Sequence, residues 1–284
     1  MLLTKVSDLL ENIRFEQSIF TLPFAYLGMV LAARGLPTWG QFLWVTVAMF
    51  GARSFGMSMN RLADIELDSK NPRGALRPIP SGRLRTLEVI VFVLFSLALL
   101  LYAAWQLNPL CVALFPVAVV VLAVYSYVKR VSWLTHIVLG TSLAGAPVGG
   151  WIAVTGTLTW EPLLLGLTVL TWAAAFDILY ACGDAEEDRA LGVHTIPSTF
   201  GVRTALICSA SIHVVTMLLL ATIGLVFALG WPFWVGVASA TGLLAYEHSL
   251  VTPTDLSKLN VAFFTVNGFI SVLIFAFTFL SLYL

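Results

Sequence analysis

Nine apolar segments, each about as long as a bilayer is thick, limit this 284-residue chain more than any other feature. An α-helix needs roughly 20 apolar residues to cross the hydrocarbon layer, where it must satisfy its own backbone hydrogen bonds. Charged residues make up only 11% of the chain, against about 25% in soluble domains. We therefore predict an all-α integral membrane protein with nine transmembrane helices around a central cavity. The predicted helices cover residues 17–33, 40–62, 87–106, 109–127, 134–154, 161–182, 204–228, 232–249 and 259–282.

The basic residues gather at one end of these helices. Of the 15 Lys and Arg, all but Arg34 and Arg53 lie in the N-terminal segment or at the ends of alternate helices and the loops that follow them. Basic loops are retained on the cytoplasmic side of a membrane. We therefore expect a cytoplasmic N-terminus, an outer C-terminus and a location in a bacterial-type inner or plasma membrane, with the functional site opening to the cytoplasm.

The N-terminal residues 1–16 have a different pattern, with apolar side chains at helical spacing and charged side chains between them. This pattern is typical of an amphipathic helix that lies on a membrane surface. We expect residues 1–284 to form a single transmembrane domain in contact with lipid. The formal net charge is 0, so the composition does not indicate a nucleic-acid partner.

Two carboxylate clusters stand out because eight of the 15 acidic residues fall in two short stretches. One cluster contains Asp64 and Asp68 and opens the polar loop 63–86; the other contains Asp184 and Asp188 in the polar loop 183–203. Carboxylates at the edge of a hydrocarbon phase are costly unless something binds them, and paired carboxylates suit Mg²⁺. We predict two magnesium sites, one in each of two pseudo-repeated halves. A solvated charged surface is the alternative for either pair alone.

Each pair continues a polar stripe into the membrane. Side chains spaced three and four residues apart share one face of a helix. A buried ionisable group in a transmembrane helix is a functional candidate, although Arg53 and Asp177 could instead form a structural ion pair. The first stripe contains Arg53, Gly56, Asn60, Asp64 and Asp68, and the second contains Asp177, Tyr180, Asp184 and Asp188.

A basic loop follows the first carboxylate pair, with Lys70, Arg73, Arg77, Arg83 and Arg85 within 16 residues. The positive-inside rule alone would explain this loop. Magnesium held by carboxylates and flanked by guanidinium groups also provides what a diphosphate requires. Tyr125, Lys129 and Arg130 could complete such a site. The four histidines show no ligand spacing and receive no role.

These motifs resemble those of the UbiA superfamily of intramembrane prenyltransferases. The first motif, NxxxDxxxD, is Asn60, Asp64 and Asp68, and the second, DxxYxxxDxxxD, runs from Asp177 to Asp188. One departure is Arg61, which stands where many members have Asp. The flanking residues resemble the branch that includes the 4-hydroxybenzoate polyprenyltransferases and some enzymes of a menaquinone route.

The resemblance implies Mg²⁺-dependent transfer of a polyprenyl group from its diphosphate to a small aromatic acceptor in quinone biosynthesis. The acceptor would be 4-hydroxybenzoate or a dihydroxynaphthoate. In this hypothesis Asp64 and Asp68 hold one ion, and Asp184 and Asp188 hold a second. The remaining roles are diphosphate binding by Arg14, Arg73, Arg77, Tyr125, Lys129 and Tyr180, and acceptor binding by Arg53, Asn60 and Asp177, with Asp177 also a proton acceptor.

Three other classes of membrane protein compete with this interpretation. The pattern of the CDP-alcohol phosphotransferases, also multispanning metal enzymes, has no match in this chain. A transporter could use paired intramembrane charges for ion coupling, but transporters usually place them at the midplane rather than at one rim. Haem-modifying members of the same superfamily are the third alternative.

Overall fold

The computed structural model describes residues 2–72 and 74–284, and within them it contains helices and no strand. The long helices lie within two residues of their predicted bounds at every end. They are α2 (Ser18–Ala33), α3 (Trp39–Ala63), α5 (Thr86–Leu107), α6 (Pro109–Val128), α7 (Thr135–Thr155), α8 (Trp160–Ala181), α11 (Val202–Val226), α12 (Trp231–Ser249) and a π-helix (Val261–Val266) continued by α13 (Asn267–Ser281). The short α-helices are α1 (Leu2–Asn12), α4 (Ile65–Lys70), α9 (Ala185–Ala190) and α10 (Ile196–Phe200).

Seven spans in the described residues are long and apolar enough to cross a membrane. This confirms an all-helical integral membrane protein. Helices α3 and α12 are not among the seven, and each carries a charged residue that is buried inside the bundle, Arg61 and Glu247 respectively. The crossing of nine helices therefore stays a prediction, as do the orientation in the membrane and the two pseudo-repeated halves.

The helix ends follow from local chemistry. Thr38 begins α3 with a capping box, in which its side chain accepts from the Gln41 amide and the Gln41 side chain accepts from the Thr38 amide. Asn108 caps α6, and Pro109 follows at the first helical position, where no amide hydrogen is needed. Gly156 ends α7 in the left-handed conformation with φ 67°.

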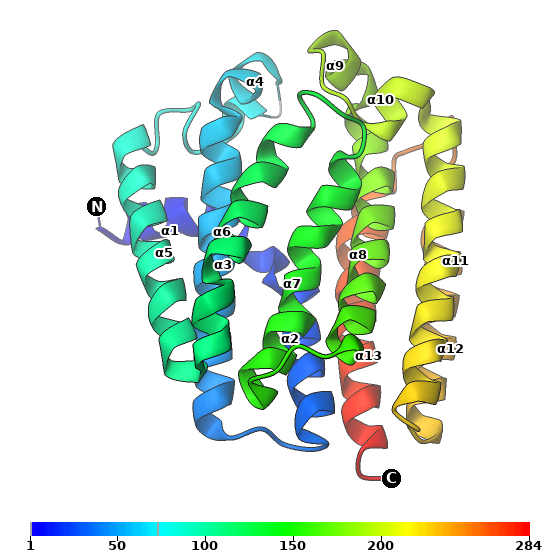
Figure 1. Cartoon of the computed structure of the whole chain (residues 1–284). Helices are drawn as coiled ribbons and strands as arrows, with labels where there is room; N and C mark the ends of the chain where they lie inside the picture. The colour runs from blue at the N-terminus through cyan, green and yellow to red at the C-terminus, as the bar shows by residue number, and fades with distance from the viewer. Residues whose placement is uncertain (1, 73) are drawn as a thin grey trace.

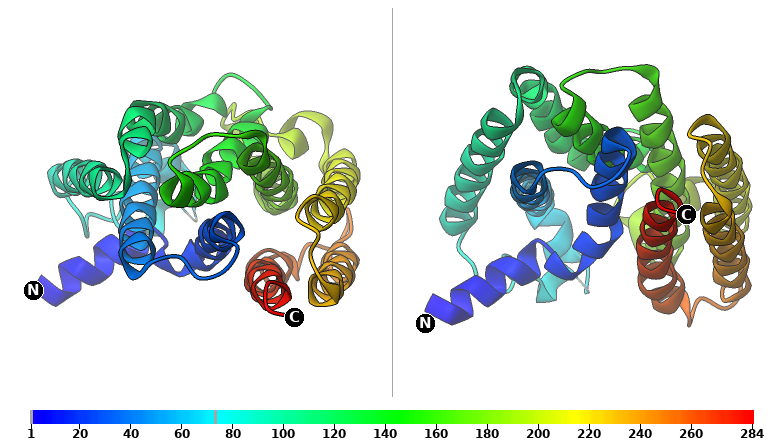
Figure 2. Two further views of the ribbon diagram at one scale, coloured as in Figure 1. Left: turned by 60° about the horizontal axis from the view of Figure 1, so that its bottom comes forward. Right: turned by 90° about the horizontal axis from the view of Figure 1, so that it is seen from below.

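Consecutive long helices pack side by side, and the last helix closes the arrangement by packing against the first long one. Figure 2 shows this ring seen from below, with α13 beside α2. Helix α7 also packs tightly on α2: a Cβ added at Gly150 would lie 2.1 Å from the Ala25 carbonyl oxygen, and one at Gly28 would lie 2.2 Å from that of Pro147. Small residues of this kind let helix backbones approach closely in membranes.

An aromatic cluster fills the space between α2, α8 and the π-helix. The Phe20 and Phe263 rings meet edge to face at 5.5 Å, and Trp172 meets Phe176 at 4.7 Å. Phe263 also packs against Tyr180, with ring centroids 4.2 Å apart. This aromatic packing therefore positions Tyr180, which also lines a polar cavity.

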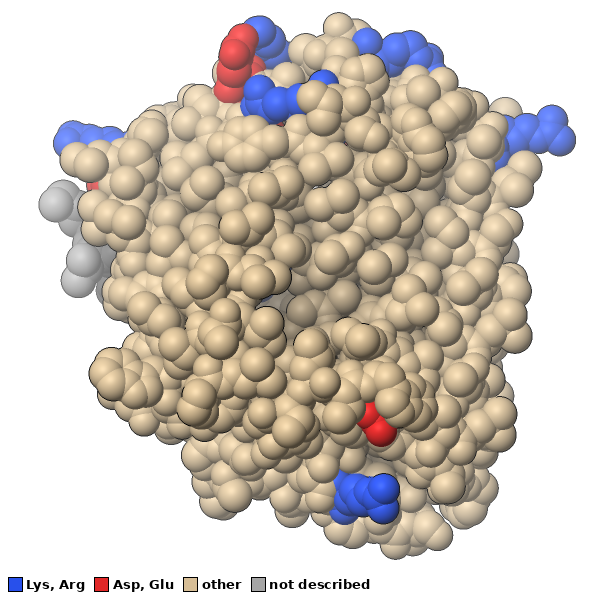
Figure 3. All heavy atoms as spheres, in the orientation of Figure 1, with Lys and Arg blue, Asp and Glu red and all other residues tan. Residues whose placement is uncertain are grey.

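Helix α1 lies across the long helices rather than along them (Figure 1). Arg83 ties it to the loop before α5 by hydrogen bonds to Glu11 at 2.5 and 2.6 Å and to Asp8 at 2.9 Å. Most charged side chains on the face shown in Figure 3 lie near the end of the bundle that carries α4 and α9, and a wide uncharged belt lies below them. This distribution agrees with helices that are embedded in a bilayer.

Candidate active site

A polar cavity of about 200 Å³ is lined by residues of α4, α7, α8 and α9 and of the loops next to them. Most of the predicted polar residues converge on it from both halves of the chain. The cavity is lined by Leu67, Asp68, Asn71, Arg77, Lys129, Thr135, His136, Asp177, Tyr180, Ala181, Asp184, Asp188, Leu191, Val193 and Thr195. The second half of the chain thus contributes all three of its predicted carboxylates to one cavity.

The first carboxylate pair is held by two basic side chains. Lys129 pairs with Asp64, and Arg77 pairs with Asp68. Asp64 is 1% exposed and does not line the cavity, whereas its partner Lys129 does. Among the described residues, Oδ1 of Asp64 and Oδ2 of Asp68 are buried without a hydrogen-bond partner.

These two buried oxygens accept no hydrogen bond among the described residues, although Nη2 of Arg130 lies 3.9 Å from Oδ1 of Asp64, and they fit a hard cation. Mg²⁺ prefers oxygen ligands and usually takes one or two carboxylates, with water and phosphate oxygens completing its shell. Among the described residues, no group of three or more His, Cys, Asp or Glu side chains is arranged as a complete metal cage. The carboxylate pairs therefore suit an ion that arrives with a phosphate substrate better than a permanently bound structural metal.

The cavity is also tied together by the backbone of its loops. Lys129 accepts a hydrogen bond at its carbonyl oxygen from the His194 amide, at 2.7 Å, while its Nζ pairs with Asp64. Thr195 caps α10 and donates a 3.4 Å hydrogen bond to Asp188 Oδ2. Lys129, the residue that caps the end of α6, thus contacts both acid-bearing loops.

His136 is the main residue that the sequence analysis missed. It is 1% exposed, and its Nδ1 lies 2.7 Å from Oδ2 of Asp177. Residue spacing does not reveal His136, because its partner lies on another helix, 41 residues away. The only available signal was that a histidine falls within the segment Trp133 to His136, which resembles the family.

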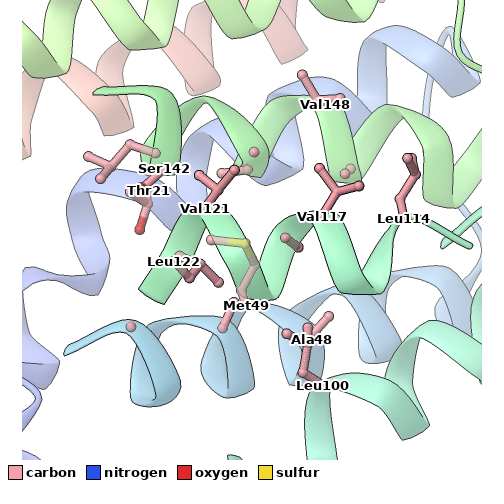
Figure 4. Close-up of a pocket in the computed structure, with 18 of the residues that line it drawn as sticks. Thr21, Ala48, Met49, Leu100, Leu114, Val117, Val121, Leu122, Ser142 and Val148 are labelled. Carbon is pink, nitrogen blue, oxygen red and sulfur yellow. The ribbon is translucent and has the colours of Figure 1, made fainter. Parts of the chain in front are cut away.

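A second cavity, of about 420 Å³, is lined almost entirely by apolar side chains of α3, α5, α6 and α7. Figure 4 shows Met49, Leu100, Val117 and Val148 around it. Arg53 and Tyr125 are its main polar residues at the end nearer the carboxylates, and Tyr125 donates a 3.2 Å hydrogen bond to the Gly56 carbonyl.

Arg53 and Asp177 therefore lie in different cavities and have different partners. Nη2 of Arg53 donates to the Arg14 carbonyl at 2.8 Å and to Oε1 of Gln17 at 3.3 Å, whereas Asp177 pairs with His136. The Arg53–Asp177 ion pair considered from the sequence is replaced by these contacts. Nε of Arg53 is buried and has no partner among the described residues.

Two other predicted residues, Asn60 and Arg14, line neither cavity. Asn60 is half-buried on α3, between the two sets of lining residues. Arg14 has a left-handed backbone, with φ 46°, and takes part through its carbonyl group in the bond to Arg53. Arg73 lies outside the described residues.

Arg61, which departs from the family pattern, is 7% exposed and donates from Nε to the Asn12 carbonyl at 3.3 Å. Asn12 is the last residue of α1. A cation at the C-terminal end of a helix satisfies a carbonyl group that has no partner within the helix, and it complements the helix dipole. Arg61 thus attaches α1 to α3.

Comparison with known proteins places this chain in one family. Residues 21–278 match the UbiA prenyltransferase family. A 4-hydroxybenzoate octaprenyltransferase from Tolumonas auensis is 32% identical over 246 residues, which cover 87% of this chain and 85% of that protein. A protein of the same name from Cupriavidus necator is 32% identical over 284 aligned residues, with 97% of each chain covered.

Solved structures agree with the sequence comparisons. A UbiA homologue from Aeropyrum pernix has a TM-score of 0.84 and 29% identity, with 92% of this chain and 96% of that chain covered. A UbiA homologue from Archaeoglobus fulgidus, bound to DMAPP and Mg²⁺, shares the fold at a TM-score of 0.78 and 20% identity, with 98% and 99% covered. The chain belongs to the UbiA prenyltransferase family and is a prenyltransferase.

Proposed function

We propose that this enzyme transfers a polyprenyl group from a polyprenyl diphosphate to 4-hydroxybenzoate in a Mg²⁺-dependent reaction. The observation that carries the proposal is the position of the two cavities. Tyr125, in the last turn of α6, lines the apolar cavity. Lys129, which caps the end of α6 about one helical turn further on, lines the polar cavity. A polar head and a long apolar tail on one substrate match this arrangement.

The diphosphate would occupy the polar cavity. Asp64 and Asp68 would hold one Mg²⁺, and Asp184 and Asp188 a second. Bound Mg²⁺ would neutralise charge on the departing diphosphate. Arg77 and Lys129 line the cavity and already pair with carboxylates, so they are placed to donate to phosphate oxygens as the allylic C–O bond breaks.

The tail would occupy the apolar cavity. Gly145 and Gly149 line it one turn apart on α7, both are exposed, and a Cβ at either would meet nothing within 4 Å. Their missing side chains leave the cavity open on the flank of the bundle. A hollow is visible on the flank in Figure 3. We propose that a polyprenyl chain longer than the cavity reaches the lipid here.

The acceptor would bind between the two cavities, in contact with residues that line each of them. Nε of Arg53 is a buried donor without a partner, which suits the acceptor's carboxylate. Asn60 would contact the ring from the same helix. Asp177, with a side chain 25% exposed toward the polar cavity, would accept a proton from the phenol. The names of the relatives support 4-hydroxybenzoate over a dihydroxynaphthoate or haem.

The test is product analysis by mass spectrometry in membranes supplied with octaprenyl diphosphate, Mg²⁺, 4-hydroxybenzoate and dihydroxynaphthoate in competition. We expect prenylated 4-hydroxybenzoate and release of diphosphate. Asp64→Asn and Asp184→Asn should abolish both. Glu66→Gln is the matched control, because Glu66 is exposed, lies in the first acidic loop and, among the described residues, forms an ion pair with Lys70 alone. Full activity in the two Asp variants, or no diphosphate release by the wild type, would overturn the proposal.

A further inference from the structure

His136 connects three elements around the polar cavity. It is the second residue of α7, its Nδ1 contacts Asp177 on α8, and its Nε2 contacts the first amide of α10. The side chain is buried, yet it belongs to the cavity lining, beside Thr135 and Tyr180.

The two contacts fix where the imidazole proton lies. The Ile196 amide can only donate, and it lies 3.3 Å from Nε2, so Nε2 accepts and carries no proton. The ring is therefore neutral with its proton on Nδ1, and Nδ1 donates to Oδ2 of Asp177 over 2.7 Å. Because the second contact sets the tautomer, the ring presents a donor and not an acceptor to the carboxylate.

We propose that His136 is a positioning residue that orients the Asp177 carboxylate toward the acceptor. One Asp177 oxygen is occupied by the Nδ1 proton, and this leaves the second oxygen to receive the phenol proton. The hydrogen bond also opposes rotation of the carboxylate out of the cavity. This inference rests on the proposed function, because it assigns His136 a task in the same reaction.

A purely structural role is the competing explanation. The Ile196 amide is one of the donors at the start of α10 that have no partner within the helix, and His136 satisfies it from another helix. The loop before α10 is also held by the Lys129 carbonyl through the His194 amide. His136 could therefore serve only to attach α10, and the experiment must separate its two nitrogens.

Two substitutions make that separation. Asn carries its amide on Cγ, where Nδ1 of histidine is attached, so His136→Asn can still donate to Asp177 but does not reach Ile196. Gln carries its amide one carbon further out, so His136→Gln can still accept from the Ile196 amide but places no donor at the Nδ1 position. His136→Ala removes both contacts.

The kinetic test compares these variants in 4-hydroxybenzoate prenylation. We expect His136→Ala to lower kcat by roughly 10- to 100-fold, as loss of an orienting partner does at other sites. The KM for prenyl diphosphate should not change. His136→Asn should recover more of kcat than His136→Gln. In an Asp177→Asn background, His136→Ala should have no further effect on kcat. Equal or better rescue by Gln, or multiplicative effects of the two substitutions, would overturn the proposal.

A spectroscopic test is independent of the acceptor. In ¹⁵N-histidine-labelled protein, the resonance missing from His136→Ala should report the Nδ1–H tautomer in the wild type. Asp177→Asn should shift its Nδ1 signal. An Nε2–H tautomer, or a spectrum unaffected by Asp177→Asn, would overturn the proposal. If the tautomer is found but no prenylated benzoate forms, the proposed function fails and the His136–Asp177 contact stands.

Discussion

The two cavities differ in what the protein must supply. In the polar cavity, carboxylates from both halves of the chain meet basic side chains, and Lys129 and Arg77 each neutralise a buried or nearly buried Asp. The apolar cavity is an empty space lined by apolar side chains. Gly145 and Gly149 leave its flank open, because neither has a side chain there. We therefore expect substitutions in the polar cavity to alter the reaction rate and the stability of the protein. Substitutions in the apolar cavity should instead alter which substrate binds.

Removal of divalent metal should have the largest effect, and only on the polar cavity. With EDTA we expect prenyl transfer to fall to background, because the diphosphate and the carboxylates then repel each other. A polyprenol has the same tail without the diphosphate, so its binding, followed by fluorescence competition, should be unchanged. Activity that persists in EDTA would remove the metal from the proposal. Loss of polyprenol binding in EDTA would show that the two cavities are not independent.

Lys129→Met should come next, because it leaves Asp64 as a buried carboxylate without its closest cation. Breaking a buried pair in this way typically costs about 3–5 kcal/mol, and the unfolding temperature should fall accordingly. Asp64→Leu combined with Lys129→Met should restore the unfolding temperature but not prenyl transfer. If the double variant is active, the pair has a structural role only.

Gly145→Leu should change chain-length preference and not the rate with short substrates. A side chain at the open flank would obstruct a long tail, and steric discrimination of this kind is worth roughly 10- to 200-fold. We expect kcat/KM to fall by that factor with octaprenyl diphosphate and to change little with geranyl diphosphate. Gly242→Leu is the control, because Gly242 on α12 is also exposed with open space around it but does not line the cavity. Equal loss with both substrates would place the obstruction elsewhere.

The smallest effect should come from acidification, which should detach α1 from the loop before α5. Helix α1 borders neither cavity. The Arg83 guanidinium, hydrogen-bonded to Glu11, lowers the pKa of the Glu11 carboxyl. The contact therefore contributes fully above the ordinary Glu pKa of about 4.3 and is lost as the pH falls through the lowered pKa. Amide hydrogen exchange in α1 should rise at that acidic pH, and Arg83→Gln should raise it slightly at neutral pH. Exchange that does not respond to either change would show that other contacts hold α1.

Helix positions could be predicted because bilayer thickness fixes the length of an apolar segment, and breakers such as Asn108-Pro109 mark the joints. The convergence of Asp68, Asp177, Asp184 and Asp188 also followed from helical spacing and a shared membrane face. Contacts between helices could not be predicted in this way. The His136–Asp177 bond and the turn of Arg53 toward Arg14 depend on how α7, α8 and the N-terminal segment pack, and no period in the sequence records this packing.

The packing of α13 against α2 has a consequence for assembly. Phe20, Phe24, Ile270 and Ile274 belong to one buried cluster, so nearly the whole chain separates the partners. During synthesis α2 enters the bilayer first, and its inner surface has no final partner until the last helix follows. Lipid or an earlier helix must cover that surface in the interval. We therefore expect chains that end before residue 267 to insert into the membrane and remain open to proteolysis along α2.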